Sequence, residues 1–194
     1  CGAWRGEVVG AEVGGGGVSS EWQGGGDTEV LRAARADGGG GRCLERAVGV
    51  FGVALWDGGE RTLGVARDGR GEKPLCDGWG GRNFLFGWEL SALAAHPAWE
   101  GQVDRDALGQ LVRLNYIPAP LSIYKGIGKV MPGTYQVLRA GARDTRTETY
   151  WDAGAVVAQG ARAPFAGSAE EAVERTEALI RQSLQGQMMA DVPL

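Results

Sequence analysis

The chain has 194 residues and a mass of 20.4 kDa, which suits one full domain together with a short piece of a second. Its formal net charge of −4 and its pI of about 5.1 argue against the basic surfaces of nucleic-acid-binding domains and polybasic membrane-binding segments. No apolar run approaches the roughly 20 residues that span a bilayer, and no signal segment opens the sequence. We therefore expect a cytoplasmic protein without nucleic-acid or membrane partners.

The cysteine and histidine content argues against disulfides, metal sites and a Ser-His-Asp triad. The three cysteines, Cys1, Cys43 and Cys76, have no CxxC spacing and are odd in number, so neither a disulfide framework nor a zinc site is predicted. The single histidine, His96, excludes multi-histidine metal sites and argues against a Ser-His-Asp triad. It follows a short apolar run and precedes a proline, so we interpret it as a structural residue at a helix end. We expect no bound metal.

Cys1 is the first residue that could carry chemistry. An N-terminal cysteine combines a nucleophilic thiol with an α-amine whose pKa of about 8 suits it to relay a proton. The alternative is that Cys1 is only the residue at which the sequence begins. The sequence alone leaves both interpretations open.

Two short helices are predicted before residue 49. Asp27 or Thr28 can cap the first, whose apolar face contains Val30 and Leu31. The second covers residues 42–48, where Cys43 is expected to be a small buried residue.

A β-hairpin is predicted between residues 49 and 75. Phe51, Val53 and Leu55 alternate with smaller residues, which is the period-2 pattern of a strand. Asp57-Gly58-Gly59 then supplies residues that tolerate positive φ, and the apolar run 63–66 returns antiparallel.

The returning strand leads into a charged, glycine-rich loop. Arg67, Asp68, Glu72 and Lys73 are crowded at the end of a core strand, where charges need partners. They can be read as a catalytic cluster or as a structural ion-pair network. We favour the structural network.

The remaining elements follow from the same patterns. Strands are predicted at 75–79, 83–86, 133–138 and 147–151, and helices at 89–95 and 104–115. Ser168 and Glu171 form a capping box that opens a long C-terminal helix.

Three strings occur here in the order and spacing of one known family. Residues 54–57 read Ala-Leu-Trp-Asp, residues 66–68 read Ala-Arg-Asp, and residues 71–75 read Gly-Glu-Lys-Pro-Leu. The chain resembles the glutaminase domain of the glutamine-hydrolysing asparagine synthetases, which are class II glutamine amidotransferases with an N-terminal nucleophile. The resemblance extends from about Trp4 to the end and is specific after Asp27.

The resemblance implies a glutamine pocket near the N-terminus. By analogy with the family, Cys1 would be the nucleophile and the Gly6 N–H would lie in the oxyanion hole. Glu7 and Asp27 would hold glutamine. Arg5 stands where the family has an asparagine that donates the second oxyanion hydrogen bond. Loss of such a donor typically costs about 2.7–4 kcal/mol in the barrier, so Arg5 is a serious departure.

A second departure is the spacing at the N-terminus. Only three residues separate Cys1 from Arg5, whereas several dozen lie between the corresponding family positions. Either the domain is internally shortened, or the chain begins within it and Cys1 is a coincidence.

The resemblance also implies the fold and the domain division. We expect an α+β protein, an incomplete four-layer αββα sandwich of two antiparallel sheets like other N-terminal-nucleophile hydrolases. Residues 1–152 would form the glutaminase domain, 153–167 a linker, and 168–194 the start, with its first helix, of an ATP-dependent synthetase domain. No cofactor is expected in this chain, while ATP and magnesium are implied for the synthetase domain.

The predicted function is glutamine hydrolysis that supplies ammonia for ATP-dependent amidation of aspartate. The expected partners are glutamine and a synthetase domain, and a homodimer is left open. Two alternatives stand beside this prediction. The chain is an inactive remnant or scaffold that has lost the pocket, or a family relative that acts on another amino acid.

Overall fold

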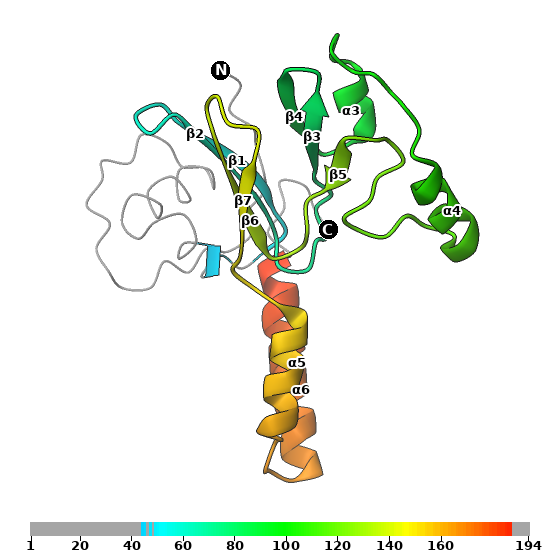
Figure 1. Ribbon diagram of the computed structural model, residues 1–194. Helices are drawn as coiled ribbons and strands as arrows, with labels where there is room; N and C mark the ends of the chain where they lie inside the picture. Colours follow the sequence, from blue (N-terminus) through cyan, green and yellow to red (C-terminus); the bar gives the residue numbers. More distant parts are fainter. Residues whose placement is uncertain (1–43, 46, 48, 188–194) are drawn as a thin grey trace. The chain divides into compact units, whose positions relative to one another are not determined.

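The computed structural model describes residues 44–45, 47 and 49–187 (Figure 1). The chain divides into two compact units, one of which is Phe51–Thr149 and contains all seven described strands. The helices α5 (Ala153–Arg162) and α6 (Ala169–Gln187) belong to the other unit.

The larger sheet is four-stranded and antiparallel, with the order β1-β2-β6-β7. Its strands are β1 (Gly52–Asp57), β2 (Thr62–Arg67), β6 (Thr134–Arg139) and β7 (Thr145–Thr149). The predicted hairpin is confirmed, because β1 and β2 pair along their whole length. The β6–β7 pair confirms the last predicted hairpin, although β7 begins two residues earlier than expected.

The turn between β1 and β2 differs from the expectation. Neither Gly58 nor Gly59 has positive φ, and Arg61 has it instead, at 51°. The cause is local, because the Asp57 Oδ1 accepts the N–H groups of Gly59 and Glu60, both at 2.9 Å. This side-chain turn holds the glycines in ordinary conformations and moves the left-handed residue to the end of the loop.

The second sheet has three antiparallel strands in the order β4-β3-β5. These strands are β3 (Cys76–Gly80), β4 (Asn83–Gly87) and β5 (Ile127–Lys129). The short helix α3 (Leu90–Ala94) packs on β4. A small core forms under this sheet from Cys76, Leu85, Leu93 and Ile127.

Helix α4 (Arg105–Leu114) begins and ends close to the predicted limits. The Asp104 carboxylate caps it by accepting the N–H groups of Asp106 and Ala107, and Asn115 ends it in the left-handed conformation. Ala107 is its only buried residue among those described, so most of its apolar side chains remain accessible.

Two helices follow Thr149. Helix α5 (Ala153–Arg162) occupies most of the segment predicted as a linker, and the Asp152 carboxylate caps it by accepting the Ala155 N–H at 2.6 Å. Helix α6 (Ala169–Gln187) begins with the predicted capping box. Ser168 N–H donates to the Glu171 carboxylate at 2.8 Å, and Glu171 N–H donates to the Ser168 Oγ at 3.2 Å.

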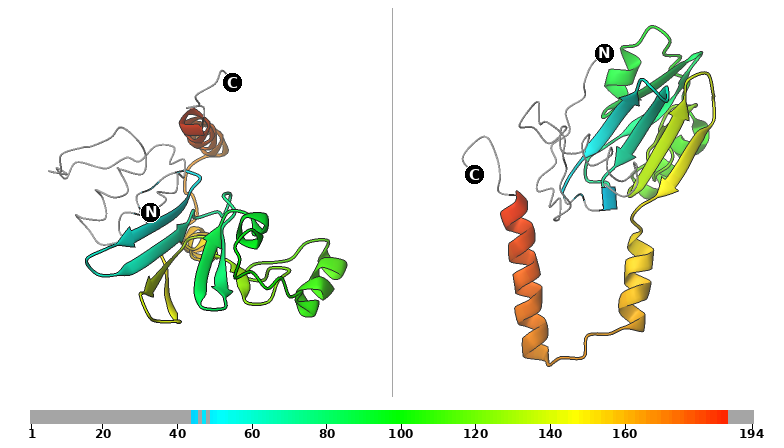
Figure 2. Two further views of the ribbon diagram at one scale, coloured as in Figure 1. Left: turned by 90° about the horizontal axis from the view of Figure 1, so that it is seen from above. Right: turned by 90° about the vertical axis from the view of Figure 1, so that its left-hand side faces the viewer.

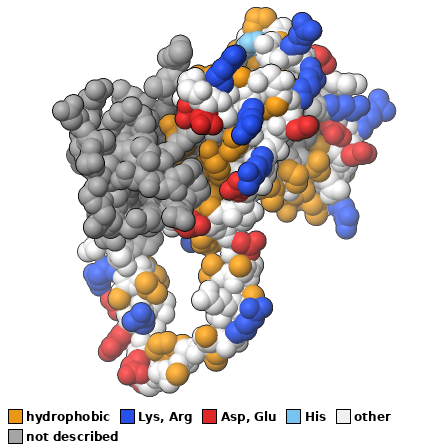
Figure 3. Space-filling model, turned by 60° about the vertical axis from the view of Figure 1, so that its left-hand side comes forward, with side chains coloured by type: hydrophobic (Ala, Val, Ile, Leu, Met, Phe, Trp, Pro, Cys, Tyr) orange, Lys and Arg blue, Asp and Glu red, His pale blue; other side chains and the backbone are white. Residues whose placement is uncertain are grey.

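The α+β class with two antiparallel sheets is confirmed, and within Phe51–Thr149 the sheets lie next to each other in both sets of views (Figures 1 and 2). On the face that Figure 3 presents, acidic and basic side chains of the described residues are interspersed. Among the described helices, none combines the length and the apolar character that crossing a membrane requires.

Candidate functional site

The residues of the predicted glutamine pocket are Cys1, Arg5, Gly6, Glu7 and Asp27, and all five lie outside the described residues. Their roles stay predictions. The same holds for the helix predicted after Asp27. Within the described residues, the loop after β2 and the space between the two sheets both contain polar side chains that are at least partly buried.

Asp68 organises the loop after β2. Its side chain is buried, with 1% of the residue exposed. The Oδ1 accepts the N–H groups of Arg70 at 3.1 Å and Glu72 at 3.0 Å, and the Oδ2 accepts that of Lys73 at 2.9 Å. Three peptide donors therefore satisfy one buried carboxylate, and they fold the loop around it.

Arg67, which carries the opposite charge to Asp68, holds the same loop. Its guanidinium donates to the carbonyl oxygens of Lys73 at 2.7 Å, Val130 at 2.8 Å and Gly71 at 2.6 Å. Burial lowers the pKa of Arg67 from its usual value, and the nearby Asp68 carboxylate offsets part of that effect. The planar guanidinium thus ties the loop after β2 to the segment before β6.

These contacts favour the structural interpretation of the charged cluster, but with other partners than expected. Arg67 donates hydrogen bonds to peptide C=O groups, and Asp68 accepts hydrogen bonds from peptide N–H groups. Glu72 makes an exposed 3.7 Å ion pair with Arg70, and the Lys73 Nζ lies 4.3 Å from the ring centroid of Trp88. The hydrogen bonds of Arg67 and Asp68 therefore hold the loop together as a structural element.

A polar hollow of about 440 Å³ lies between the two sheets. Asp77 and Trp79 of β3 share one strand face, as alternate residues do, and Gln136 of β6 lies across from them. The β6–β7 turn contributes Asp144 and Thr145 to the same lining.

Asp77 is the most perturbed acid of the hollow. Burial raises its pKa from 3.8 to about 6, and no opposite charge counteracts the effect. Across the hollow, the Gln136 Oε1 is buried and has no hydrogen-bond donor. The hollow therefore contains a desolvated carboxyl group and an unsatisfied amide oxygen.

Arg143 closes one end of this hollow by joining the two sheets. Its guanidinium lies 5.2 Å from the Trp79 ring and donates to the Gly81 carbonyl at 2.9 Å. In return, the Trp79 Nε1–H donates to the Arg143 carbonyl at 3.1 Å. The positive charge is thus directed to the tip of the β3–β4 hairpin.

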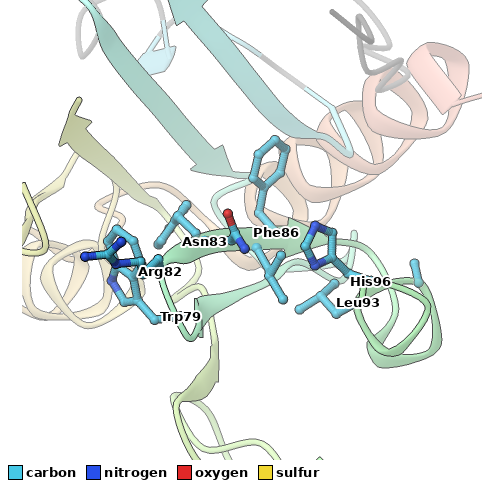
Figure 4. Close-up of a pocket in the computed structure, with 9 residues that line it drawn as sticks. Trp79, Arg82, Asn83, Phe86, Leu93 and His96 are labelled. Atoms are coloured by element: carbon cyan, nitrogen blue, oxygen red, sulfur yellow. The ribbon is translucent and has the colours of Figure 1, made fainter. Parts of the chain in front are cut away.

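A second hollow lies over the β3–β4 hairpin and α3 (Figure 4). Trp79 and Arg82 lie at one end of it, and Leu93 and His96 at the other. The His96 Nδ1 accepts the Ala98 N–H at 3.1 Å, which agrees with the structural role expected for this histidine. No serine, threonine or cysteine lines this hollow.

Cys76 is the one cysteine among the described residues, and its position disfavours reactivity. It is 6% exposed, and burial raises the pKa of its thiol. Since the thiolate is the reactive form, Cys76 is suited to packing rather than to nucleophilic attack. No group of three or more acidic, histidine or cysteine side chains in the described ranges could hold a metal ion.

The sequence-based reasoning missed the hollow between the sheets. A charged residue at position 77, inside an otherwise uncharged strand, was the available signal, since alternation places it on the same face as Trp79. Gln136 gave no such signal, because its place opposite Asp77 depends on how two distant segments pack.

Comparison with known proteins identifies the relatives of the chain. The sequence model of a family described as "Glutamine amidotransferase domain" matches residues 16–151. Asparagine synthetase [glutamine-hydrolyzing] 3 of Bacillus subtilis is 29% identical over 153 residues, which are 78% of this chain and 24% of that protein. A provisionally named glutamine-hydrolysing asparagine synthetase 2 of Methanocaldococcus jannaschii is 27% identical over 57% of this chain and 22% of its own length. The chain spans about a quarter of the length of these relatives.

Proposed function

The chain belongs to the glutamine amidotransferase domain family, and from this premise we propose that it is the ammonia-releasing part of a glutamine-dependent asparagine synthetase. The observation that carries the proposal is the extent of the family match. It runs from residue 16 to residue 151, so it includes Asp27 and both antiparallel sheets.

In this proposal the Cys1 thiolate attacks the side-chain amide carbon of glutamine. The carbon–nitrogen bond breaks, the α-amino group of Cys1 returns a proton to the leaving nitrogen, and ammonia departs. Water then hydrolyses the thioester, which releases glutamate and restores the thiol. Gly6 N–H stabilises the oxyanion in both steps, while Glu7 and Asp27 bind the substrate.

The charged loop after β2 has a structural role in this proposal. Arg67 and Asp68 hold the loop after β2 in one conformation through six hydrogen bonds to peptide groups. We assign these two residues a supporting, not a chemical, role.

In this proposal, a second domain uses the ammonia. The relatives are about four times as long as the matched segment and are named for asparagine synthesis. We propose that the ammonia amidates aspartate in a synthetase domain that uses ATP and magnesium. We also propose that the protein works in the cytoplasm.

Arg5 favours a second candidate, a domain that has kept the fold and lost the chemistry. The family asparagine is replaced there by a longer, charged side chain that must fold back to reach an oxyanion. A chain that binds neither glutamine nor a glutamine analogue would fit this candidate.

Glutamine hydrolysis by the purified chain tests the first proposal. Glutamate formation is measured for the unaltered chain, for Cys1→Ser and for the matched control Cys43→Ser. We expect turnover that Cys1→Ser abolishes and Cys43→Ser retains. Turnover that survives Cys1→Ser would place the chemistry elsewhere, and no turnover in any variant favours the inactive candidate.

A further inference from the structure

The hollow between the sheets contains hydrogen-bond acceptors that lack donors. The Gln136 Oε1 is buried without a partner, and no hydrogen bond or ion pair reaches the Asp77 side chain from any described residue. A buried acceptor without a donor, such as the Gln136 Oε1, is destabilising because it has lost its hydrogen bonds to water. Such an arrangement persists more readily if something that donates hydrogen bonds binds there.

The cationic side chain that lines the hollow does not fill this need. Arg143 lines the hollow, but its guanidinium is stacked on Trp79 and bonded to the Gly81 carbonyl at the hairpin tip. Burial is the cause of the raised pKa of Asp77, and no attraction to a positive charge lowers this pKa again. The carboxylate is therefore left without a counter-ion when it is ionised.

The lining of the hollow also contains two aromatic rings. Trp79 and Phe84 form an edge-to-face pair with centroids 5.3 Å apart, and both line the hollow beside Asp77 and Gln136. Aromatic rings attract ammonium groups through their negative faces. Because no set of three ligating acidic, histidine or cysteine side chains is found in the described residues, a chelated divalent metal fits less well.

We propose that the hollow between Asp77 and Gln136 binds ammonium, with the carboxylate as counter-ion and the amide oxygen as acceptor. The choice of ammonium among small cations rests on the proposed function, which generates ammonia in this domain. Its N–H groups supply the donors that both side chains lack. None of the residues that line the hollow is among those predicted for the glutamine pocket.

The test is the dependence of thermal unfolding on the added cation. The midpoint of the 194-residue chain is measured at about pH 7.5, where Asp77 is ionised, in chlorides of ammonium, potassium, sodium and tetramethylammonium at equal ionic strength. Ammonium at ten times its dissociation constant is expected to raise the midpoint by about 3–5 °C more than the other salts. Tetramethylammonium is the decisive comparison, since it carries the charge without N–H donors.

Two variants locate the effect. Asp77→Asn and Gln136→Leu are expected to remove the ammonium-specific rise, whereas the exposed control Asp106→Asn keeps it. Equal rises in all four salts, an equal rise in potassium, or a rise that survives Asp77→Asn would each overturn the proposal. If a variant does not fold, the four-salt comparison on the unaltered chain decides alone. Glutamine turnover is measured separately, so loss of ammonium specificity and loss of glutaminase activity remain distinguishable results.

Discussion

The Asp68 Oδ2 accepts the N–H of Lys73 at 2.9 Å, across a loop of glycines and charges in which the carboxylate itself is buried. This contact, with the two that the Oδ1 makes, explains why so polar a segment can end a core strand. The carboxylate replaces water as the partner of three peptide donors.

Asp68→Asn is expected to destabilise the unit Phe51–Thr149 strongly. The amide keeps the shape but replaces one acceptor oxygen by a donor that faces peptide N–H groups, so about 3 kcal/mol of unfolding free energy should be lost. Urea unfolding followed by tryptophan fluorescence measures the loss. The exposed Asp106→Asn should stay within about 0.5 kcal/mol of the unaltered chain. A similar small effect for Asp68→Asn would show that the loop does not depend on this carboxylate.

Arg67→Lys is expected to cost about 2 kcal/mol although it retains the charge. An ammonium on a flexible stem cannot reproduce the planar geometry with which the guanidinium donates to three carbonyl oxygens. The comparison is Arg70→Lys, whose side chain is exposed and makes only a long ion pair with Glu72. Equal stabilities of the two variants in the same urea titration would contradict the role assigned to Arg67.

The elevated pKa of Asp77 predicts a defined pH dependence. In the folded chain the carboxyl has a pKa of about 6, above its usual 3.8, so the folded state binds the proton more tightly. The contribution is fully present below about pH 4 and is lost as pH rises through about 6. In sodium buffers, Asp77→Asn should therefore gain stability relative to the unaltered chain across this window, by about 2–3 kcal/mol at most.

The measurement is the difference in unfolding free energy between Asp77→Asn and the unaltered chain at several pH values from about 4 to 8. Using the difference cancels the titration of other groups. A flat difference would mean that Asp77 is not perturbed by folding, and a decline with rising pH would show that the carboxylate has a favourable partner.

The capping box at α6 predicts a local effect. Ser168→Ala removes the acceptor for the Glu171 N–H, and Glu171→Ala removes the acceptor for the Ser168 N–H. Each change should weaken the first turn of α6 by about 1 kcal/mol. Faster amide hydrogen exchange at residues 169–172, with unchanged exchange in β2, is the expected signature. Uniform acceleration throughout the chain would instead indicate a global effect.

Much of the fold could be predicted because its signals are local. The alternation of Phe51, Val53 and Leu55, and the pairing of Ser168 with Glu171, depend on neighbours within a few residues. Helix α5 was interpreted as linker because small residues dominate it, yet Asp152 caps it and alanines propagate it. Helical propensity therefore makes part of the predicted linker a helix, and the domain division itself stays a prediction.

The parts that could not be predicted depend on distant contacts. Arg61 adopts positive φ because the Asp57 carboxylate fixes the preceding amides, which composition alone does not reveal. The partners of Arg67 include the Val130 carbonyl, 63 residues away. Asp77 and Gln136 likewise meet only when the two sheets pack, so a search for local motifs could not pair them.

Alkylation by a glutamine-analogue electrophile tests the central claim most directly. The intact chain is treated with the electrophile, and peptide mass spectrometry locates the adduct, with and without excess glutamine. The account predicts a single adduct on the Cys1 thiol that glutamine suppresses, and no adduct on the buried Cys76. An unmodified Cys1, or a modification that glutamine does not slow, would contradict the claim that this domain binds glutamine next to an N-terminal nucleophile.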